Sequence, residues 1–287
     1  MGFENLSPAE IEELNDAYLP RRTVANAEQY LSDAAQRSAE IRATLTRHLD
    51  IAYGDTSFQT LDIFPAALQT APVFVFIHGG YWWALDKSFY SDIAPSFVSA
   101  GATVVLLNYD LCPIVTIPEI TRQIKQAVKW VHENIGDYNG DRDKLHLCGH
   151  SAGGHLAGMM MTTDWQAEFG LPGNLLKSAT PLSGLFDIEP HRHTELQAHI
   201  QLTAADAKAN SPQNLPLYST CPVLCAVGGG ESGAFKKQSL DFADKCRQAG
   251  IGVEYLETGT DNHFDITNRL QDPDDPMTRA ILGQMGL

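Results

Sequence analysis

Residues 145–157 read LHLCGHSAGGHLA, and they place Ser151 between a strand-like segment and a helix-like segment. The run KLHLCGH at 144–150 is rich in apolar residues, as strands buried on both faces of a parallel sheet are. The run that follows the serine, GGHLAGMMM, is typical of a helix. A serine within G-x-S-x-G at such a junction stands on a sharp turn that small residues permit. The pattern predicts that Ser151 is a nucleophile raised above the edge of a sheet.

Strand-like segments alternate with helical ones from residue 48 onward. Residues 48–53 and 60–65 alternate apolar and polar side chains, as half-buried antiparallel strands do. The later strand-like runs lie at 73–78, 103–109, 144–150, 178–184, 222–228 and 252–258. Further helical stretches lie at about 88–100, 117–134, 235–249 and 276–285. This alternation predicts an α/β fold with a mostly parallel, doubly wound sheet.

The chain has the size of one large α/β domain. It has 287 residues, of which 44% are hydrophobic, so we expect a single domain over 1–287. A helical arm is expected over 1–45, beginning at the capping-box sequence Ser7-Pro8-Ala9-Glu10. Residues 186–218 are polar and irregular between two strands. We interpret them as a small cap over the active site.

Composition excludes several classes of partner. The formal net charge is −15, and such an acidic protein repels nucleic acid and anionic membranes. The five cysteines are odd in number, and Cys221 and Cys225 have no second pair, so neither a disulfide framework nor a metal site is expected. The N-terminus has no signal-peptide pattern, and no apolar run reaches the ~20 residues of a membrane span. We expect a cytoplasmic protein.

A second glycine-rich corner ends the apolar run at 73–78. It reads HGGYW at 78–82, and Gly79 and Gly80 let the backbone approach a substrate and present N–H groups. The N–H of Ala152 lies at the start of the helix that follows the nucleophile, where helix dipoles favour negative charge. We predict that these two corners form one oxyanion hole, with Gly80 and Ala152 as donors. His78 is interpreted as a brace for the loop.

Other aromatic and histidine side chains carry weaker predictions. Tyr81, Trp82 and Trp83 are candidates for the substrate pocket, with plain core packing as the alternative. His191 and His193 have a spacing that resembles metal ligands, but no matching cluster exists elsewhere in the sequence. A solvated cap loop is the interpretation for both.

A serine nucleophile needs a histidine base and a carboxylate that orients the histidine. In a doubly wound hydrolase the order along the chain is serine, acid, histidine. Only His263 lies beyond the last predicted strand, so it is the predicted base. The first carboxylate after the run 222–228 is Glu231, which we favour as the acid. Asp187, which follows the preceding strand, is the alternative.

Four motifs together resemble those of the kynurenine formamidase (arylformamidase)-like esterases of the α/β-hydrolase superfamily. They are HGGYW at 78–82, GHSAGGHLA at 149–157, VGGGES at 227–232 and NHF at 262–264. The similarity extends over most of the chain. The family commonly has Asp in a D-S-x-E-F context where this sequence has Glu231.

The resemblance implies a catalytic role for Ser151, Glu231 and His263, and an oxyanion role for the region of Gly79, Gly80 and Ala152. It also implies hydrolysis of an aryl formamide, such as N-formylkynurenine, or of small esters.

The sequence therefore predicts a serine hydrolase that needs no cofactor and acts on a small molecule through an acyl-enzyme. A short-chain carboxylesterase, or a carbamate or anilide hydrolase, is the alternative within enzymes. A non-catalytic binding protein on the same scaffold and a membrane-surface lipase are the alternatives outside that class. The sequence leaves open a homodimer formed through the N-terminal arm.

Overall fold

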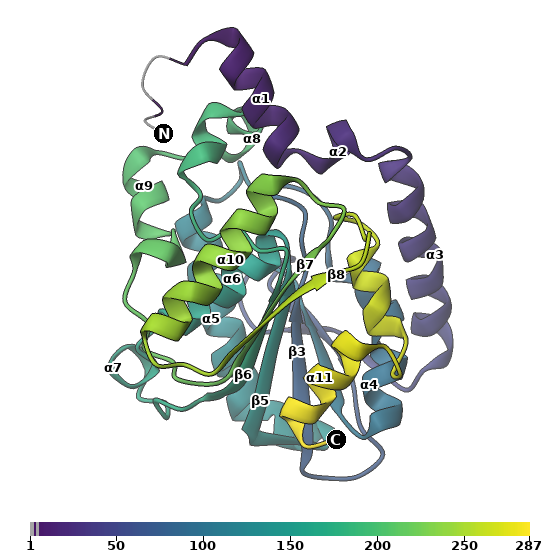
Figure 1. Cartoon of the computed structure of the whole chain (residues 1–287). Coiled ribbons are helices and arrows are strands. Elements are labelled where there is room, and N and C mark those ends of the chain that lie inside the picture. Colours follow the sequence, from purple (N-terminus) through teal and green to yellow (C-terminus); the bar gives the residue numbers. More distant parts are fainter. Residues whose placement is uncertain (1–2, 4–5) are drawn as a thin grey trace.

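An eight-stranded sheet forms the centre of the molecule (Figure 1). The computed structural model describes residue 3 and residues 6–287. The strands are β1 His48–Ala52, β2 Thr60–Phe64, β3 Ala71–Ile77, β4 Thr103–Leu107, β5 Gly140–His150, β6 Leu176–Leu182, β7 Val223–Gly228 and β8 Val253–Thr258. Their order in the sheet is β1-β2-β4-β3-β5-β6-β7-β8. β2 pairs antiparallel with β1 and β4, and every other pair is parallel. The predicted α/β class and mostly parallel sheet are confirmed.

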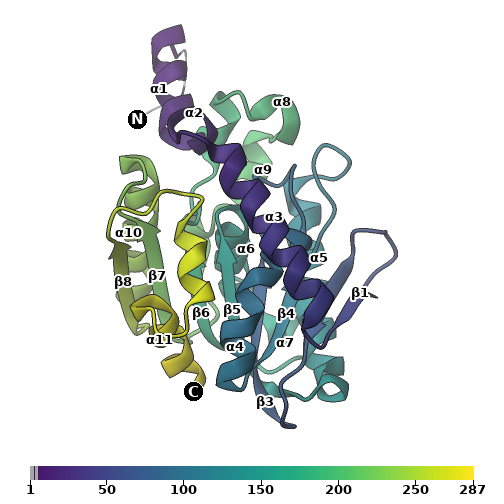
Figure 2. The same ribbon diagram turned by 90° about the vertical axis from the view of Figure 1, so that its right-hand side faces the viewer.

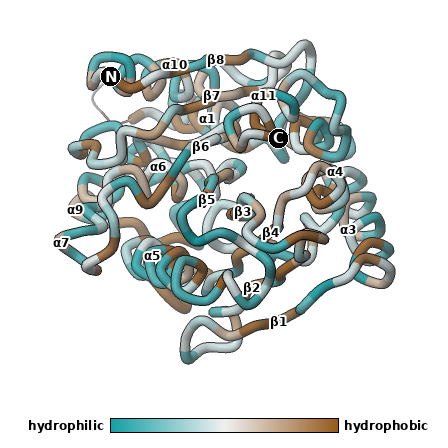
Figure 3. Tube along the Cα trace, turned by 90° about the horizontal axis from the view of Figure 1, so that it is seen from below, coloured by the Kyte–Doolittle hydropathy of each residue, from teal (hydrophilic) through white to brown (hydrophobic). Residues whose placement is uncertain are grey.

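Helices cover both faces of this sheet, as the view along the strands in Figure 3 shows. On one side lie α5 Ile117–Asn134, α6 Ala152–Met161 and α10 Gly233–Gln248. On the other lie α4 Ala94–Ala100 and α11 Pro276–Met285. Shorter helical segments are η1 Lys87–Ile93, η2 Ile135–Tyr138, α7 Trp165–Phe169 and η5 Ile266–Gln271.

Each face of the sheet has its own hydrophobic core, because side chains along a strand alternate between faces. In β3, Val73, Val75 and Ile77 pack with α5 and α6, while Phe74 and Phe76 pack with α4 and α11. A strand buried on both faces has no polar positions, which explains the continuous apolar run in the sequence. The two cores hold the carboxyl ends of β5, β7 and β8 in a fixed arrangement.

The N-terminal arm consists of α1 Pro8–Tyr18, α2 Pro20–Thr23 and α3 Ala27–Thr44, and it follows one end and one side of the sheet (Figure 2). The predicted capping box at Ser7 and Glu10 is present. The arm is attached to later parts of the chain, because Ser232 Oγ donates to the carbonyl of Ala17 at 2.5 Å and Asn262 Nδ2 donates to the Tyr30 hydroxyl at 3.1 Å.

The segment between β6 and β7 contains short helices, η3 Glu189–His193, α8 Gln197–Ile200, α9 Ala204–Ala209 and η4 Pro212–Asn214. The expectation that His191 is solvated is wrong, because its side chain is fully buried and its ring lies 4.9 Å from that of Tyr18. The arm covers it, which the local sequence of the cap does not reveal. His193 is half-buried, stacked on Phe3 at 5.1 Å. All five cysteines are free and buried. Within the described residues, no helix has the length and apolarity that crossing a membrane requires.

Candidate active site

The turn that carries Ser151 has a strained backbone. Ser151 has φ 58° and ψ −117°, a backbone conformation that residues other than glycine rarely adopt. Its N–H donates to the carbonyl of Leu182 at 2.9 Å, which anchors the turn to β6. A Cβ at Gly149 would collide with the carbonyl of Gly153, and a Cβ at Gly153 would collide with that of Ile77. The glycines of G-x-S-x-G are therefore required for the turn to close against β3.

Ser151, His263 and Glu231 form a continuous hydrogen-bonded chain. Ser151 Oγ lies 2.9 Å from His263 Nε2, and His263 Nδ1 lies 2.7 Å from Glu231 Oε2. The three residues follow β5, β8 and β7, which run parallel with β6 between β5 and β7, so their carboxyl ends lie at the same end of the sheet. All three side chains are buried. The geometry suits transfer of the serine proton to the imidazole while the carboxylate fixes the ring.

The alternative acid, Asp187, and the neighbouring carboxylate of Asp261 have different partners. Asp187 accepts hydrogen bonds from Glu189 N–H at 3.2 Å and Ser211 Oγ at 3.4 Å. Asp261, two residues before the histidine, pairs with Arg269. Within the described residues, Glu231 is the carboxylate hydrogen-bonded to the His263 ring.

The two glycine-rich corners meet beside the serine. A Cβ at Gly79 would lie 3.2 Å from Ser151 Cβ, so the loop after β3 packs directly on the turn after β5. Gly80 has φ 113°, a conformation that favours glycine, and a Cβ there would collide with the carbonyl of Ala84. Gly80 lines the same cavity as Ser151, and Ala152 begins α6 next to the serine. That the N–H groups of Gly80 and Ala152 form an oxyanion hole stays a prediction.

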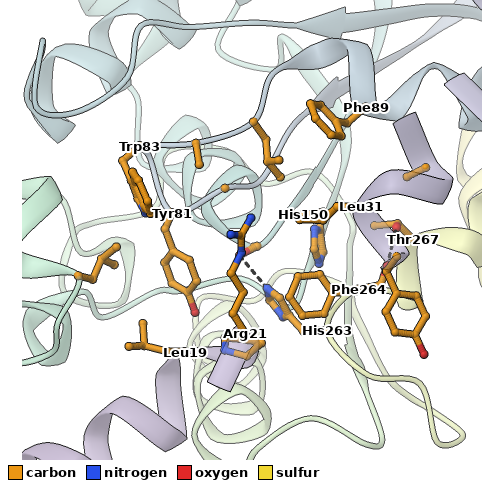
Figure 4. Close-up of a pocket in the computed structure, with 18 of the residues that line it drawn as sticks. Leu19, Arg21, Leu31, Tyr81, Trp83, Phe89, His150, His263, Phe264 and Thr267 are labelled. Carbon is orange, nitrogen blue, oxygen red and sulfur yellow. Dashed lines mark hydrogen bonds between the residues drawn. The ribbon is translucent and has the colours of Figure 1, made fainter. Parts of the chain in front are cut away.

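A cavity of about 240 Å³ opens onto Ser151 and His263. Its walls come from the arm, the loop after Gly80, the cap and the loop after β8. Figure 4 shows Tyr81 and Trp83 on one side of it, with His263 and Phe264 on the other. The volume is below the roughly 300–1,000 Å³ of typical drug-sized ligand sites. The cavity therefore fits a small ligand with an aromatic or aliphatic part.

Comparison with known proteins identifies the family. The BD-FAE family model matches residues 61–199. A kynurenine formamidase from Danio rerio is 30% identical over 263 residues, covering 89% of this chain and 87% of that protein. The chain belongs to the kynurenine formamidase family. The resemblance inferred from the four motifs is confirmed.

Other proteins similar to this chain have different names. The esterase LipQ of Mycobacterium tuberculosis is 30% identical, covering 82% of this chain and 63% of that protein. A solved structure of a protein provisionally named as a thioesterase, from Silicibacter sp. TM1040, has a TM-score of 0.82 at 32% identity, covering 94% of this chain and 98% of that one. The chain is thus an enzyme with the α/β-hydrolase fold, and its relatives support hydrolase activity on amide or ester substrates.

The predicted pocket role of Trp82 is wrong for this formamidase family member. Trp82 is fully buried, and its Nε1 donates to His155 Nδ1 at 3.1 Å, whereas Tyr81 and Trp83 line the cavity. Tyr81 and Trp82 both have positive φ, so the loop turns sharply and sends neighbouring rings in different directions. The Tyr81 hydroxyl donates to the carbonyl of Tyr18, which ties this loop to the arm.

Two buried histidines, His78 and His155, have structural roles. His78 Nδ1 lies 2.6 Å from the carbonyl oxygen of Gly79, and its ring stacks on Tyr109 at 4.2 Å, as expected of a brace for the loop. His155 Nε2 lies 2.7 Å from the carbonyl oxygen of Asn210, which fixes α6 to the cap. Burial lowers the pKa of each to about 4, so both rings are neutral near pH 7.

Ser183 is a part of the site that sequence reasoning missed. Glu231 Oε1 accepts hydrogen bonds from Ser183 Oγ and from Gly228 N–H, the latter at 2.8 Å. Both carboxylate oxygens are therefore occupied, which fixes the plane in which the acid meets the histidine. Ser183 directly follows β6, and its place at the carboxyl end of a strand is the signal that could have found it.

Ser183→Ala is expected to lower the free energy of unfolding by about 1–3 kcal/mol, because a buried carboxylate oxygen loses one of its two donors. Urea denaturation followed by circular dichroism measures this change. Ser91→Ala is the matched control, since Ser91 is also buried but its Oγ has no hydrogen-bond partner in the described part of the chain. Equal losses in both variants would contradict the role given to Ser183.

Proposed function

We propose that this protein is a serine hydrolase that cleaves small aryl formamides, amides or carboxyl esters through an acyl-enzyme. The observation that carries the proposal is the chain of contacts from Ser151 Oγ to His263 Nε2 at 2.9 Å and from His263 Nδ1 to Glu231 at 2.7 Å. The nucleophile and the base of this chain line a cavity that fits a small molecule. Free, buried cysteines are typical of a reducing compartment, so the proposal places the enzyme in the cytoplasm.

The reaction begins when His263 accepts the Ser151 proton as the serine oxygen attacks the substrate carbonyl. The Glu231 carboxylate stabilises the imidazolium that forms. The N–H groups of Gly80 and Ala152 stabilise the negative charge on the tetrahedral oxygen. His263 then returns the proton to the departing amine or alcohol. Water, activated by the same histidine, hydrolyses the acyl-enzyme and restores Ser151.

An aryl formamide is the substrate class that the surroundings support best. The relatives at about 30% identity over most of the chain include kynurenine formamidases. The cavity walls carry Tyr81, Trp83, Phe89 and Phe264, and aromatic side chains of this kind pack well on an aromatic leaving group. A formyl group is the smallest acyl group, in keeping with a cavity of about 240 Å³.

The test is a comparison of kcat/KM across N-formylkynurenine, a phenyl carbamate, an anilide and p-nitrophenyl esters of increasing chain length. We expect kcat/KM for the formamide to exceed kcat/KM for an anilide whose acyl group is one carbon longer. The expected ratio is roughly 10–200-fold, the discrimination that one extra carbon typically brings in a close-fitting pocket. Higher kcat/KM on the esters would support the alternative, a short-chain carboxylesterase. The similarity to the esterase LipQ favours that alternative.

A further inference from the structure

The imidazole of His263 is held at two ends by hydrogen bonds, from Ser151 at Nε2 and to Glu231 at Nδ1. Hydrogen bonds at these two atoms do not by themselves prevent the side chain from rotating about its Cα–Cβ and Cβ–Cγ bonds when they break. Packing against the faces of the ring is what limits this motion. The ring of His150 lies 4.7 Å from that of His263 with an interplanar angle of 42°, and the ring of Phe235 lies 4.6 Å away at 49°.

These two rings approach the histidine from different surroundings. His150 lines the catalytic cavity together with Ser151 and His263. Phe235 lines a second, smaller cavity of about 20 Å³, which also touches His263 and Glu231. The base therefore contacts two rings, one carried by the turn that holds Ser151 and one at the start of α10. Figure 4 shows the His150 and His263 rings side by side at the cavity.

The two ring nitrogens of His150 are unfavourable in their buried position. It is buried, and within the described residues neither of its ring nitrogens makes a hydrogen bond of good geometry, although the backbone of His263 lies beside the ring. A buried polar group without a partner costs about 1–3 kcal/mol, so the nitrogens of His150 do not stabilise the fold and its favourable contacts come from the packing of the ring. Burial, and then the neighbouring His263, hold the pKa of His150 well below its usual range. The ring is thus neutral and does not repel the imidazolium that forms on His263 during the reaction.

The position of His150 in the chain gives its ring a rigid support. It directly precedes Ser151, whose strained backbone is anchored to β6 through Leu182. A Cβ at Gly79 would lie 3.2 Å from His150 Nδ1, so the loop after β3 also packs against it. One side chain therefore contacts the loop of the predicted oxyanion hole and the base, and is carried by the turn that holds the nucleophile.

We propose that His150 is a positioning residue for the general base: its ring, carried by the turn that holds Ser151, keeps His263 aligned between Ser151 and Glu231. The inference rests on the proposed function, because it concerns the same hydrogen-bonded chain. The contribution belongs to the ring and its packing, and the ring nitrogens are dispensable. His150 is not a second base, since within the described residues it has no hydrogen bond to Ser151 or to a carboxylate.

Two substitutions separate the ring from its nitrogens. His150→Asn keeps a polar side chain but removes the ring, and kcat is expected to fall by roughly 10–100-fold, the loss that a misplaced catalytic group produces. KM is expected to change by less than about threefold, because the aromatic walls formed by Tyr81, Trp83 and Phe264 remain. His150→Phe keeps a ring and is expected to retain kcat within about threefold. Rates are measured per active site, titrated by long incubation with a fluorophosphonate.

A second readout distinguishes positioning from stability. The initial rate of fluorophosphonate labelling of Ser151 is expected to fall in parallel with kcat in His150→Asn, because that reaction also needs the base. The controls are His146→Asn and His146→Phe in β5, since His146 is equally buried but hydrogen-bonds to Ser178 at 2.9 Å. These controls are expected to lower the melting temperature and leave kcat per titrated site unchanged.

Wild-type kcat in His150→Asn, or equal losses in His150→Asn and His150→Phe, would overturn the inference. The second result would assign the role to the ring nitrogens. Full activity in Ser151→Ala would overturn the proposed function itself, so the two failures are distinguishable.

Discussion

Ser151→Ala is expected to lower kcat by roughly 10⁶-fold on every substrate that the wild-type enzyme hydrolyses, because the variant lacks the oxygen that forms the acyl-enzyme. His263→Ala is expected to lose about as much. The double variant is expected to lose no more than either single variant, since members of such a triad act as a unit. The physical reason is the 2.9 Å contact between Ser151 Oγ and His263 Nε2, which makes each group useless without the other. Steady-state rates on the substrate panel measure all three.

The controls for this prediction address folding and contamination. Ser151→Ala removes one buried hydroxyl and leaves the turn in place, so its melting temperature is expected to stay near that of the wild type. Ser91→Ala removes another buried hydroxyl and is expected to leave kcat unchanged. A residual rate in Ser151→Ala above about 1% of the wild type, unaffected by a fluorophosphonate, would show that another nucleophile carries the reaction.

The sheet and the turn that carries Ser151 are the features that the sequence predicts well, because both follow from local patterns. The predicted strand at 73–78 corresponds to β3 Ala71–Ile77, and the predicted strand at 252–258 to β8 Val253–Thr258. A strand buried on both faces must be apolar throughout, so its position is visible without any knowledge of its neighbours. The glycines around Ser151 predict the turn equally well, because the turn leaves no room for side chains at those positions.

The walls of the cavity could not be predicted in the same way, because they depend on which distant segments meet. Leu19, Tyr30 and Leu31 of the arm line the cavity with Ser151, more than a hundred residues away in the chain. The helical pattern of the arm predicts helices but not what they cover. The directions of Trp82 and Trp83 depend on positive φ angles in their loop, to which the periodicity of helices and strands does not apply.

Burial of polar side chains was the other feature beyond the reach of local patterns. The segment around His191 is polar and reads as a solvated loop, but the arm closes over it and buries the ring. The arm and the cap are held together by Arg22, which donates to Glu195 at 2.5 Å. Such a contact between residues far apart in the chain leaves no signal in either segment alone.

Glu231→Gln is expected to lower kcat by about 10⁴-fold, the loss typical of replacing a triad carboxylate by an amide. The structure gives the reason. Ser183 Oγ and Gly228 N–H both donate to Oε1, so the amide oxygen of a glutamine must occupy that position. The amide NH₂ then faces His263 Nδ1 and donates to it, which leaves the proton on Nε2. A histidine protonated at Nε2 cannot accept the proton of Ser151.

Two companion variants make the test of the acid specific. Glu231→Asp keeps the charge but shortens the side chain, and a loss of roughly 10–100-fold in kcat is expected from the displaced carboxylate. Asp187→Asn is the matched control, because Asp187 accepts hydrogen bonds from Glu189 N–H and Ser211 Oγ. This substitution is expected to leave kcat within about threefold of the wild type. Near-normal turnover in Glu231→Gln together with a large loss in Asp187→Asn would transfer the role of the acid to Asp187. The predicted losses in Glu231→Gln and Asp187→Asn differ by at least about a thousandfold, so single measurements of kcat on one substrate decide which residue is the acid.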